Sequence, residues 1–269
     1  MGFGICLQSV IPVRIEPTHK SEMVTQVLFG ELYRVIENQD HWIRVQLNYD
    51  NYEGWIDQKQ FFSLDVEEYI RLVNAETQVS LDLVQLLSNE KRHSILPIPL
   101  GCSLPGIWDH RFSIGKEIFS FDGLISDAGA FESMLTSQQR IKAKQTLIDN
   151  AMLYINAPYL WGGRTPFGID CSGLTQMVYK LKKIKLLRDA SQQATHGEPL
   201  NFISESEPGD LAFFDDEEGN IIHVGMIMDK HRIIHASGKV RIDIIDHEGI
   251  FNEEESRYTH KLRVIKRII

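Results

Sequence analysis

The chain has few cysteines, and none of them is paired at a spacing that a disulfide framework or metal site would use. Its 269 residues contain only three, Cys6, Cys102 and Cys171, which lie far apart and form no CxxC motif. A zinc ribbon or a disulfide-stapled fold needs closely spaced or paired cysteines, so neither is expected. Each thiol is therefore either a small buried side chain or a reactive group.

Long apolar runs and an excess of positive charge are also missing. No apolar stretch approaches the roughly 20 residues that span a bilayer, so membrane insertion is not expected. The first residues, MGFGICLQSVIPVRIEP, lack the basic start and apolar core of a secretion signal. The expected location is the cytoplasm, or the periplasm or cell exterior if a leader has been removed. The formal net charge of −9 argues against binding to nucleic acid, because phosphates require a basic surface.

What the chain does contain is a change of pattern along its length. Short runs rich in Val, Ile, Tyr and Trp, separated by Pro, Gly, Asn and Asp, fill residues 1–65 and predict a small, partly open β-barrel. Residues 66–130 carry a weaker strand pattern, with one or two short helices at the start, and are interpreted as a second small β domain. In residues 131–269 helical patterns precede strands, which indicates an α+β domain with a mostly antiparallel sheet.

Two helices are expected in the last domain. Apolar residues recur at helical spacing in SQQRIKAKQTLIDNAMLYIN, where Ser137 is the candidate N-cap. A second helical pattern begins directly after Cys171. The strand-like runs that follow are DLAFF, HVGMIM, RIIHAS, VRIDII and KLRVIKRII.

The segment YLWGGRTPFGIDCSG places Cys171 between a Gly- and Pro-rich loop and the start of a helix. There the positive end of the helix dipole stabilises a thiolate and is expected to lower the pKa of the cysteine. Free backbone N–H groups at the same point suit an oxyanion. The alternative is a buried cysteine beside glycines that only make turns. The helix start and the histidines downstream favour a nucleophile.

Two of the ten histidines, His223 and His235, each border a predicted strand and have small neighbours. With a turn between them, the two strands can pair as a hairpin that brings both imidazoles to one edge. One imidazole can then accept the thiol proton while the other orients the first and sets its tautomer. Either histidine alone would also fit a core or surface position. The remaining histidines lie in charged or loop contexts and are interpreted as solvated.

Four runs, YLWGGRTPFGIDCSG, EPGDLAFF, HVGMIM and IIHASG, resemble in order the sequence blocks of the NlpC-type, papain-like cysteine peptidases that act on cell walls. The resemblance covers about residues 135–269. It implies a papain-like α+β fold and a catalytic triad of Cys171, His223 and His235. No metal and no organic cofactor are implied.

The same resemblance assigns further residues around the nucleophile. It implies that Tyr159 helps to bind the oxyanion and that Trp161 lines the substrate cleft. It also places Asp170 and Ser172, on either side of the cysteine, among the substrate-binding residues. For the two aromatic side chains, plain packing around the loop is the alternative.

The N-terminal runs PVR, SEMVTQVLFGE, HWIRV and YEGWI resemble bacterial SH3-like domains. Two such modules ahead of the peptidase domain resemble the subgroup that cleaves the γ-D-glutamyl–diamino-acid bond of murein peptides with a free N-terminal L-Ala. This resemblance implies that Asp189, in RDASQQ, is the counter-ion of that ammonium, with Glu22 and Tyr52 closing the pocket. A buried ammonium must be paired, so carboxylates and a phenol are reasonable partners. Ordinary surface positions are the alternative for Glu22 and Tyr52.

The function expected from the sequence is a monomeric cysteine peptidase that hydrolyses L-Ala-γ-D-Glu-diamino acid peptides in cell-wall recycling. The residue at the third position, diaminopimelate or Lys, is left open. One alternative is a papain-like amidase or acyltransferase that uses the same triad on another acyl group. Another is a peptidoglycan-binding protein whose catalytic domain is idle.

Overall fold

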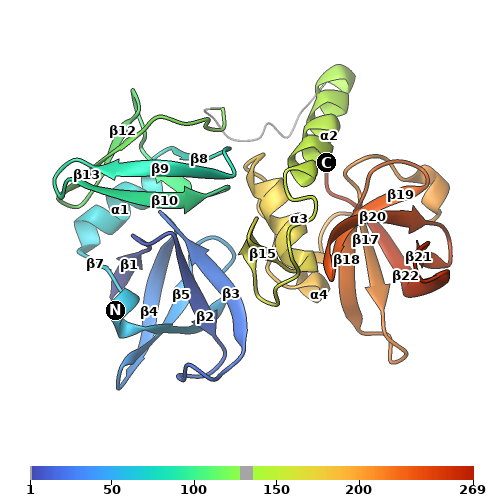
Figure 1. Ribbon diagram of the computed structural model, residues 1–269, viewed down its shortest axis with the longest axis horizontal. Coiled ribbons are helices and arrows are strands. Elements are labelled where there is room, and N and C mark those ends of the chain that lie inside the picture. The colour runs from blue at the N-terminus through green and yellow to red at the C-terminus, as the bar shows by residue number, and fades with distance from the viewer. Residues whose placement is uncertain (1, 128–135) are drawn as a thin grey trace. The chain divides into compact units, whose positions relative to one another are not determined.

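The computed structural model describes residues 2–127 and 136–269. The chain divides into two compact units, residues 1–130 and 131–269, which are described separately (Figure 1). The domain boundary expected between residues 130 and 131 lies outside the described residues. The antiparallel sheets and few helices confirm the expected α+β class. Within the described ranges, no helix is long and apolar enough to cross a bilayer.

A seven-stranded antiparallel sheet forms the first part of unit 1 and curls around a hydrophobic core (Figure 1). In WIRVQL every second side chain is buried, so one face of the strand points inward. The strand order is β3-β2-β6-β5-β4-β1-β7. The bounds are β1 (Phe3–Ile5), β2 (Val10–Arg14), β3 (Met23–Leu28), β4 (Leu32–Gln39), β5 (Trp42–Leu47), β6 (Glu53–Asp57) and β7 (Ser63–Leu64), with a short 3-10 turn, η1 (Gln58–Gln60).

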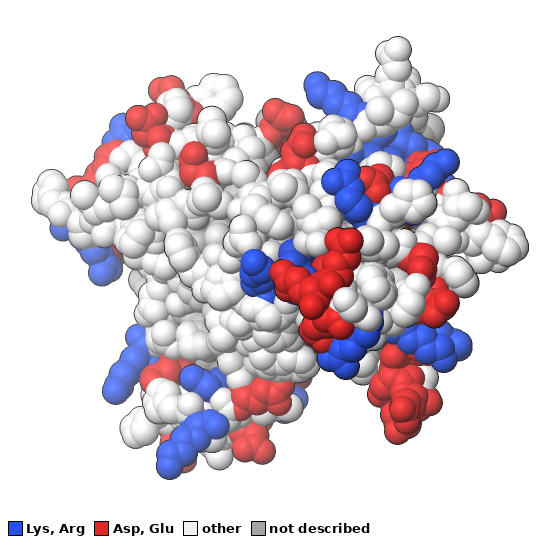
Figure 2. All heavy atoms as spheres, turned by 45° about the vertical axis from the view of Figure 1, so that its right-hand side comes forward, with Lys and Arg blue, Asp and Glu red and all other residues white. Residues whose placement is uncertain are grey.

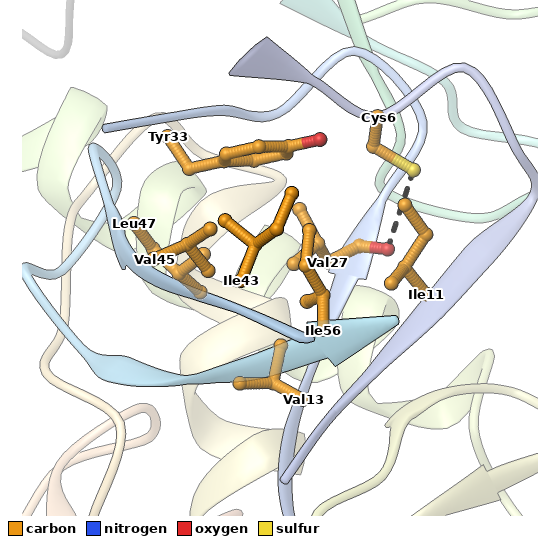
Figure 3. Close-up of a cluster of buried hydrophobic side chains, with 9 residues drawn as sticks. All are labelled: Cys6, Ile11, Val13, Val27, Tyr33, Ile43, Val45, Leu47 and Ile56. Atoms are coloured by element: carbon orange, nitrogen blue, oxygen red, sulfur yellow. Dashed lines mark hydrogen bonds between the residues drawn. The ribbon is translucent and has the colours of Figure 1, made fainter. Parts of the chain in front are cut away.

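Cys6 belongs to the core of this sheet (Figure 3). Its side chain is fully buried among aliphatic residues such as Ile11 and Ile56, and its thiol lies 3.6 Å from the carbonyl oxygen of Val27. The hydroxyl of Tyr33, buried in the same cluster, donates to the carbonyl of Ile5 at 3.3 Å. Cys6 is therefore a packing residue.

The second part of unit 1 begins with helix α1 (Val66–Asn74), whose first turn is capped by the side chain of Asp65. Phe29 makes edge-on contacts with Phe112 and Phe119, so this part packs on the first sheet. Cys102 is fully buried here. Two antiparallel sheets follow α1, ordered β10-β9-β13-β12 and β11-β8. The bounds are β8 (Thr77–Val79), β9 (Val84–Asn89), β10 (Ser94–Pro99), β11 (Ser103–Pro105), β12 (Arg111–Ile114) and β13 (Glu117–Phe121).

Unit 2 is built on a second seven-stranded antiparallel sheet, ordered β16-β22-β17-β18-β19-β20-β21. An additional pairing between β21 and β22 joins strands that are far apart in this order, so the sheet closes on itself. The bounds are β16 (Glu198–Leu200), β17 (Leu211–Asp215), β18 (Ile221–Ile227), β19 (Arg232–Ser237), β20 (Lys239–Ile245), β21 (Gly249–Asn252) and β22 (Arg257–Arg267); β14 (Arg164–Thr165) and β15 (Gly168–Ile169) form a small hairpin.

The helices of unit 2 are α2 (Ser137–Met152), α3 (Cys171–Lys180) and α4 (Ala190–Gln193), with a 3-10 turn, η2 (Ile203–Glu205). The prediction that Ser137 caps α2 is wrong by one residue: Thr136 is the N-cap and forms a reciprocal capping box with Gln139. The predicted apolar stripe of α2 is only partly buried, since Leu147 is inside but Ile141 is 69% exposed. The second predicted helix is α3, which packs against β18 and β19 (Figure 1).

On the face shown in Figure 2, Lys and Arg side chains lie singly or in small groups among Asp and Glu side chains. This mixture fits the acidic net charge and offers no extended basic surface on that face for a phosphate backbone.

Candidate active site

Cys171 is the first residue of helix α3, at the end of a tightly folded loop. The preceding residue, Asp170, is the N-cap: its carboxylate accepts hydrogen bonds from the N–H groups of Gly173 at 2.7 Å and Gly162 at 2.8 Å. A Cβ on Gly173 would lie only 2.3 Å from the carbonyl oxygen of Gly163. Glycine is therefore required for the loop to lie directly on the helix start, and that contact fixes the position of the cysteine.

The sulfur of Cys171 is surrounded by protein. Its side chain is buried, and it receives hydrogen bonds from the backbone N–H groups of Val224 and Ser172. These two bonds favour the thiolate, as the sequence predicts for a helix N-terminus. Burial outweighs them and, together with the nearby carboxylate of Asp170, raises the pKa of Cys171 to about 12. The expected preformed thiolate is therefore wrong for this structure, in which the thiol is neutral.

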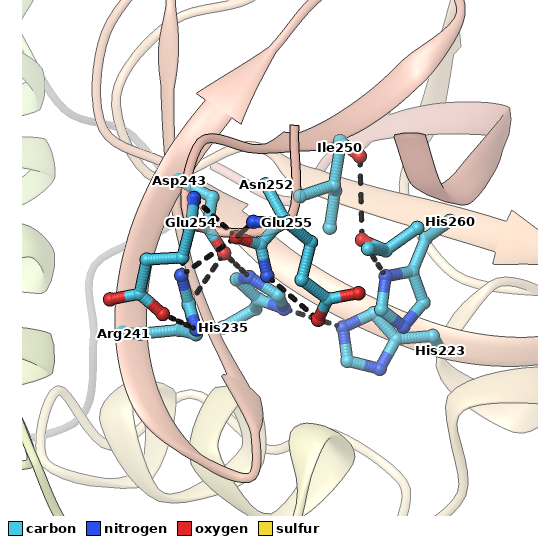
Figure 4. Close-up of polar contacts among 10 residues, drawn as sticks. His223, His235, Arg241, Asp243, Ile250, Asn252, Glu254, Glu255 and His260 are labelled. Atoms are coloured by element: carbon cyan, nitrogen blue, oxygen red, sulfur yellow. Dashed lines mark hydrogen bonds and ion pairs between the residues drawn. The ribbon is translucent and has the colours of Figure 1, made fainter. Parts of the chain in front are cut away.

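His223 and His235 lie next to each other on the strands that the sequence predicts. β18 and β19 pair antiparallel with Gly225 opposite His235, and the bulge-free pairing brings the two imidazoles together (Figure 4). Nε2 of His223 lies 2.9 Å from Nδ1 of His235. Because Nε2 of His223 is occupied by this bond, only Nδ1 of that ring is left to exchange a proton with a thiol.

The cysteine and the histidine approach each other through neighbouring backbone. Helix α3 packs on β18, and the N–H that reaches the sulfur of Cys171 belongs to Val224, the residue after His223. Within the described part of the chain, no residue forms a hydrogen bond with Nδ1 of His223. The geometry thus leaves the base and its acceptor nitrogen available beside the nucleophile.

A third histidine, His260 on β22, completes the cluster. Its ring stacks on that of His223, with centroids 4.1 Å apart and an angle of 26° between the planes (Figure 4). The prediction that it is solvated is wrong, because β18 and β22 both pair with β17, and His260 lies across that strand from His223. Burial, and then the neighbouring His235, lower the pKa of His260 to about 4. Burial also lowers the pKa of His223 well below its ordinary value, so both rings are neutral at pH 7.

Two charged residues that the sequence analysis did not predict, Asp243 and Arg241, form a hydrogen-bonded network with His235. Asp243 on β20 accepts from Nε2 of His235 at 2.9 Å, and Arg241 pairs with that carboxylate (Figure 4). The available signal was the run VRIDII, in which two charges two residues apart share one face of an otherwise apolar strand.

Tyr159 lies in the loop before the nucleophile. It is held by a bond from its backbone N–H to the carbonyl of Gly238, at 3.0 Å. Burial, followed by the charges of Cys171 and Asp170, raises its pKa to about 12. The phenol therefore keeps its proton at neutral pH and is a hydrogen-bond donor close to the sulfur, as an oxyanion ligand must be. Trp161, two residues on, is 57% exposed.

Asp170 and Ser172 are turned inward toward a buried arginine. Arg188 is 1% exposed; it donates to both carboxylate oxygens of Asp170, at 3.0 and 2.6 Å, and to the hydroxyl of Ser172 at 2.8 Å. These side chains hold the loop and the helix start together. The following residue, Asp189, is partly buried and is the N-cap residue of α4.

Glu22 and Tyr52 belong to unit 1. Glu22 is exposed just before β3, and Tyr52 is partly buried against the core cluster just before β6. Both strands pair with β2, where Arg14 stands opposite both Met23 and Trp55. The substrate-binding role of the two residues stays a prediction. For metals, the described residues contain no group of three or more His, Cys, Asp or Glu side chains that could hold an ion.

The closed antiparallel sheet, the helix that begins at a cysteine and the pair of hydrogen-bonded histidines define a papain-like cysteine peptidase. Comparison with known proteins agrees: residues 156–259 match the NlpC/P60 family, and residues 13–61 match the bacterial dipeptidyl-peptidase Sh3 domain. Residues 156–259 are thus similar to the NlpC/P60 family, and the chain is a cysteine peptidase of the hydrolase class.

Several relatives match most of the chain. The γ-D-glutamyl-L-lysine dipeptidyl-peptidase of Bacillus cereus is 27% identical, over 81% of this chain and 68% of its own length. Dipeptidyl-peptidase 6 of Lysinibacillus sphaericus is 25% identical, over 87% of this chain and 88% of its own. Among solved structures, an NlpC/P60 family protein from Bacillus cereus shares the fold, with a TM-score of 0.80, 19% identity and 99% of each chain covered.

Proposed function

We propose that this chain hydrolyses the bond between γ-D-glutamate and the diamino acid of murein peptides. The observation that carries the proposal is the match to dipeptidyl-peptidases over both the Sh3 segment and the peptidase domain, and not over the peptidase domain alone. The site supports it, because its neutral thiol, neutral imidazole and phenol are the groups that acyl transfer from an amide requires.

The reaction follows from the positions of these groups. The sulfur of Cys171 attacks the γ-carbonyl carbon of D-Glu while its proton passes to Nδ1 of His223. The backbone N–H of Cys171 and the hydroxyl of Tyr159 hold the oxyanion. His223 returns the proton to the amine of the diamino acid as the C–N bond breaks, which leaves a thioester. Water, deprotonated by His223, then releases L-Ala-γ-D-Glu.

The substrate's N-terminus is assigned to three residues. In this proposal Asp189 and Glu22 neutralise the free ammonium of L-Ala, and the hydroxyl of Tyr52 accepts one of its hydrogen bonds. The assignment rests on the resemblance and on charge. The role in wall-peptide recycling, the monomeric state and the cytoplasmic location stay predictions.

A digest of mixed muropeptides tests the proposal. Mass spectrometry should show L-Ala-γ-D-Glu and peptides that begin with the diamino acid, and their masses also identify that residue. The Cys171→Ala protein should give neither, because a methyl group replaces the nucleophile. New products that retain the γ-glutamyl bond would indicate amidase or transferase chemistry. Binding to sacculi without any product would indicate a docking protein.

A further inference from the structure

Asp243 contacts His235 at the ring nitrogen that does not face His223. The residue is 7% exposed, and its Oδ2 lies 2.9 Å from Nε2 of His235. Burial opposes its ionisation, but the hydrogen bond to His235 and the Arg241 guanidinium hold the pKa of Asp243 below its usual range. The group is therefore a carboxylate at neutral pH, and a carboxylate can only accept hydrogen bonds.

Arg241 holds that carboxylate in one orientation (Figure 4). Its Nε lies 2.8 Å from Oδ2, and one of its terminal nitrogens donates to Oδ1 at 2.9 Å. The guanidinium is held in turn by Glu254, at 3.1 Å. Strand register produces this arrangement: Arg241 pairs directly with His235, and Asp243 is two residues further along the same face of β20.

The fixed carboxylate determines where each imidazole carries its proton. Because Asp243 only accepts, Nε2 of His235 must be an N–H, and the relay uses the form of this ring in which Nδ1 carries a lone pair. That lone pair faces Nε2 of His223 at 2.9 Å, so this nitrogen must be an N–H as well. Nδ1 of His223 is then the unprotonated nitrogen. This is the only atom of the ring left to receive the thiol proton.

We propose that Asp243, clamped by Arg241, is a positioning residue that acts through His235 to set the tautomer and orientation of His223. The active site is thus a relay of four side chains, Cys171, His223, His235 and Asp243. When His223 gains the thiol proton, the positive charge is stabilised by the carboxylate through the hydrogen bonds of His235. The proposal rests on the roles of Cys171 and His223 but not on the identity of the substrate.

Asp243→Asn tests the relay, because it removes the charge while keeping the shape. An amide can present either its oxygen or its NH₂ group to His235, so the tautomer is no longer enforced. In triads, the same substitution next to the base lowers kcat by about 10⁴-fold. Here the carboxylate is one ring further away, and we expect a loss of about 10²-fold in kcat with KM changed by less than about twofold.

The protonation of the ring nitrogens gives a direct readout. NMR of the whole protein with ¹⁵N-labelled histidine at pH 7 shows which nitrogen of each ring carries the proton. In the wild type both His223 and His235 should carry the proton on Nε2 alone. In Asp243→Asn a measurable population should carry it on Nδ1. The matched control is Asp210→Asn, which breaks another buried Asp–Arg pair in unit 2, with Arg267, and should leave both tautomers and kcat unchanged.

The outcomes separate this inference from the proposed function. An Nδ1 proton on either ring in the wild type overturns the relay, and this measurement stands even if Asp243→Asn does not fold. Unchanged tautomers and kcat in a folded Asp243→Asn protein overturn it as well. The predicted tautomers in a protein that cleaves no murein peptide would refute the substrate assignment and leave the relay intact.

Discussion

The sulfur of Cys171 is subject to two opposing influences. Backbone N–H groups at the helix start favour the thiolate, while burial and the carboxylate of Asp170 favour the thiol, and burial has the larger effect. Cys171 and His223 are therefore both neutral at pH 7, and in the proposed reaction the thiolate forms as His223 takes the proton during attack. This differs from a resting ion pair in a way that pH can reveal.

The rate at which Cys171 is alkylated should depend on pH in the way expected for a thiol with a raised pKa. Because that pKa lies above the value of an ordinary thiol, the thiolate fraction at pH 6 to 8 is smaller than in a free cysteine. Iodoacetamide should therefore label Cys171 more slowly than a cysteine peptide at pH 7, with a rate that still rises above pH 9. Peptide mass spectrometry gives the rates, and the fully buried Cys6 and Cys102 report unfolding. A rate that levels off below pH 7 would show a preformed thiolate.

Single site residues could be predicted from the sequence where the neighbouring residues form a recognisable pattern. A glycine-rich loop before a helix identified Cys171, and small neighbours on predicted strands identified His223 and His235. Asp243 had only the two charges of the run VRIDII, and His260 had no local signature. Asp243 reaches the site through the pairing of β20 with β19. His260 reaches it through the pairing of β22 with β17, which joins segments distant in sequence.

Among the elements, the start of helix α3 is held by an internal clamp of three buried side chains. Arg188, Asp170 and Ser172 form a buried network that joins the loop before α4 to the residues on either side of the nucleophile. The sequence placed the helix correctly but assigned Asp170 and Ser172 to the substrate. Their burial against Arg188 was not predictable, because the arginine lies beyond the end of the helix and its contact requires the folded domain.

Removing this clamp should loosen α3 more than the rest of the domain. Arg188→Met keeps the length of the side chain but leaves the buried Asp170 carboxylate without its cation, which typically costs about 3–5 kcal/mol. We expect faster hydrogen exchange of the α3 amides and a lower kcat. The control, Arg232→Met, breaks an exposed pair with Asp229 that is worth less than about 1 kcal/mol. Equal exchange of the α3 amides in both variants would show that the clamp does not hold the helix.

For the whole molecule, the α+β class and the short strands of unit 1 could be predicted from the sequence, because the strand, helix and turn patterns that indicate them are local. The closure of the second sheet did not, since the β21–β22 pairing is fixed by tertiary packing. For the whole molecule we propose that the peptidase requires a free N-terminus on its murein peptide and that residues of the Sh3 segment contribute to recognising it.

The most direct test of that claim compares kcat/KM for L-Ala-γ-D-Glu-diaminopimelate with that for its N-acetyl form. Acetylation removes the positive charge and adds bulk at the N-terminus, so the capped peptide should be cut about 10⁴-fold less efficiently. Glu22→Gln should lower kcat/KM for the free peptide by about 10- to 100-fold, whereas Glu16→Gln, an exposed change in the same β2–β3 connection, should not. Comparable rates on the free and capped peptides, with Glu22→Gln no worse than Glu16→Gln, would contradict the account.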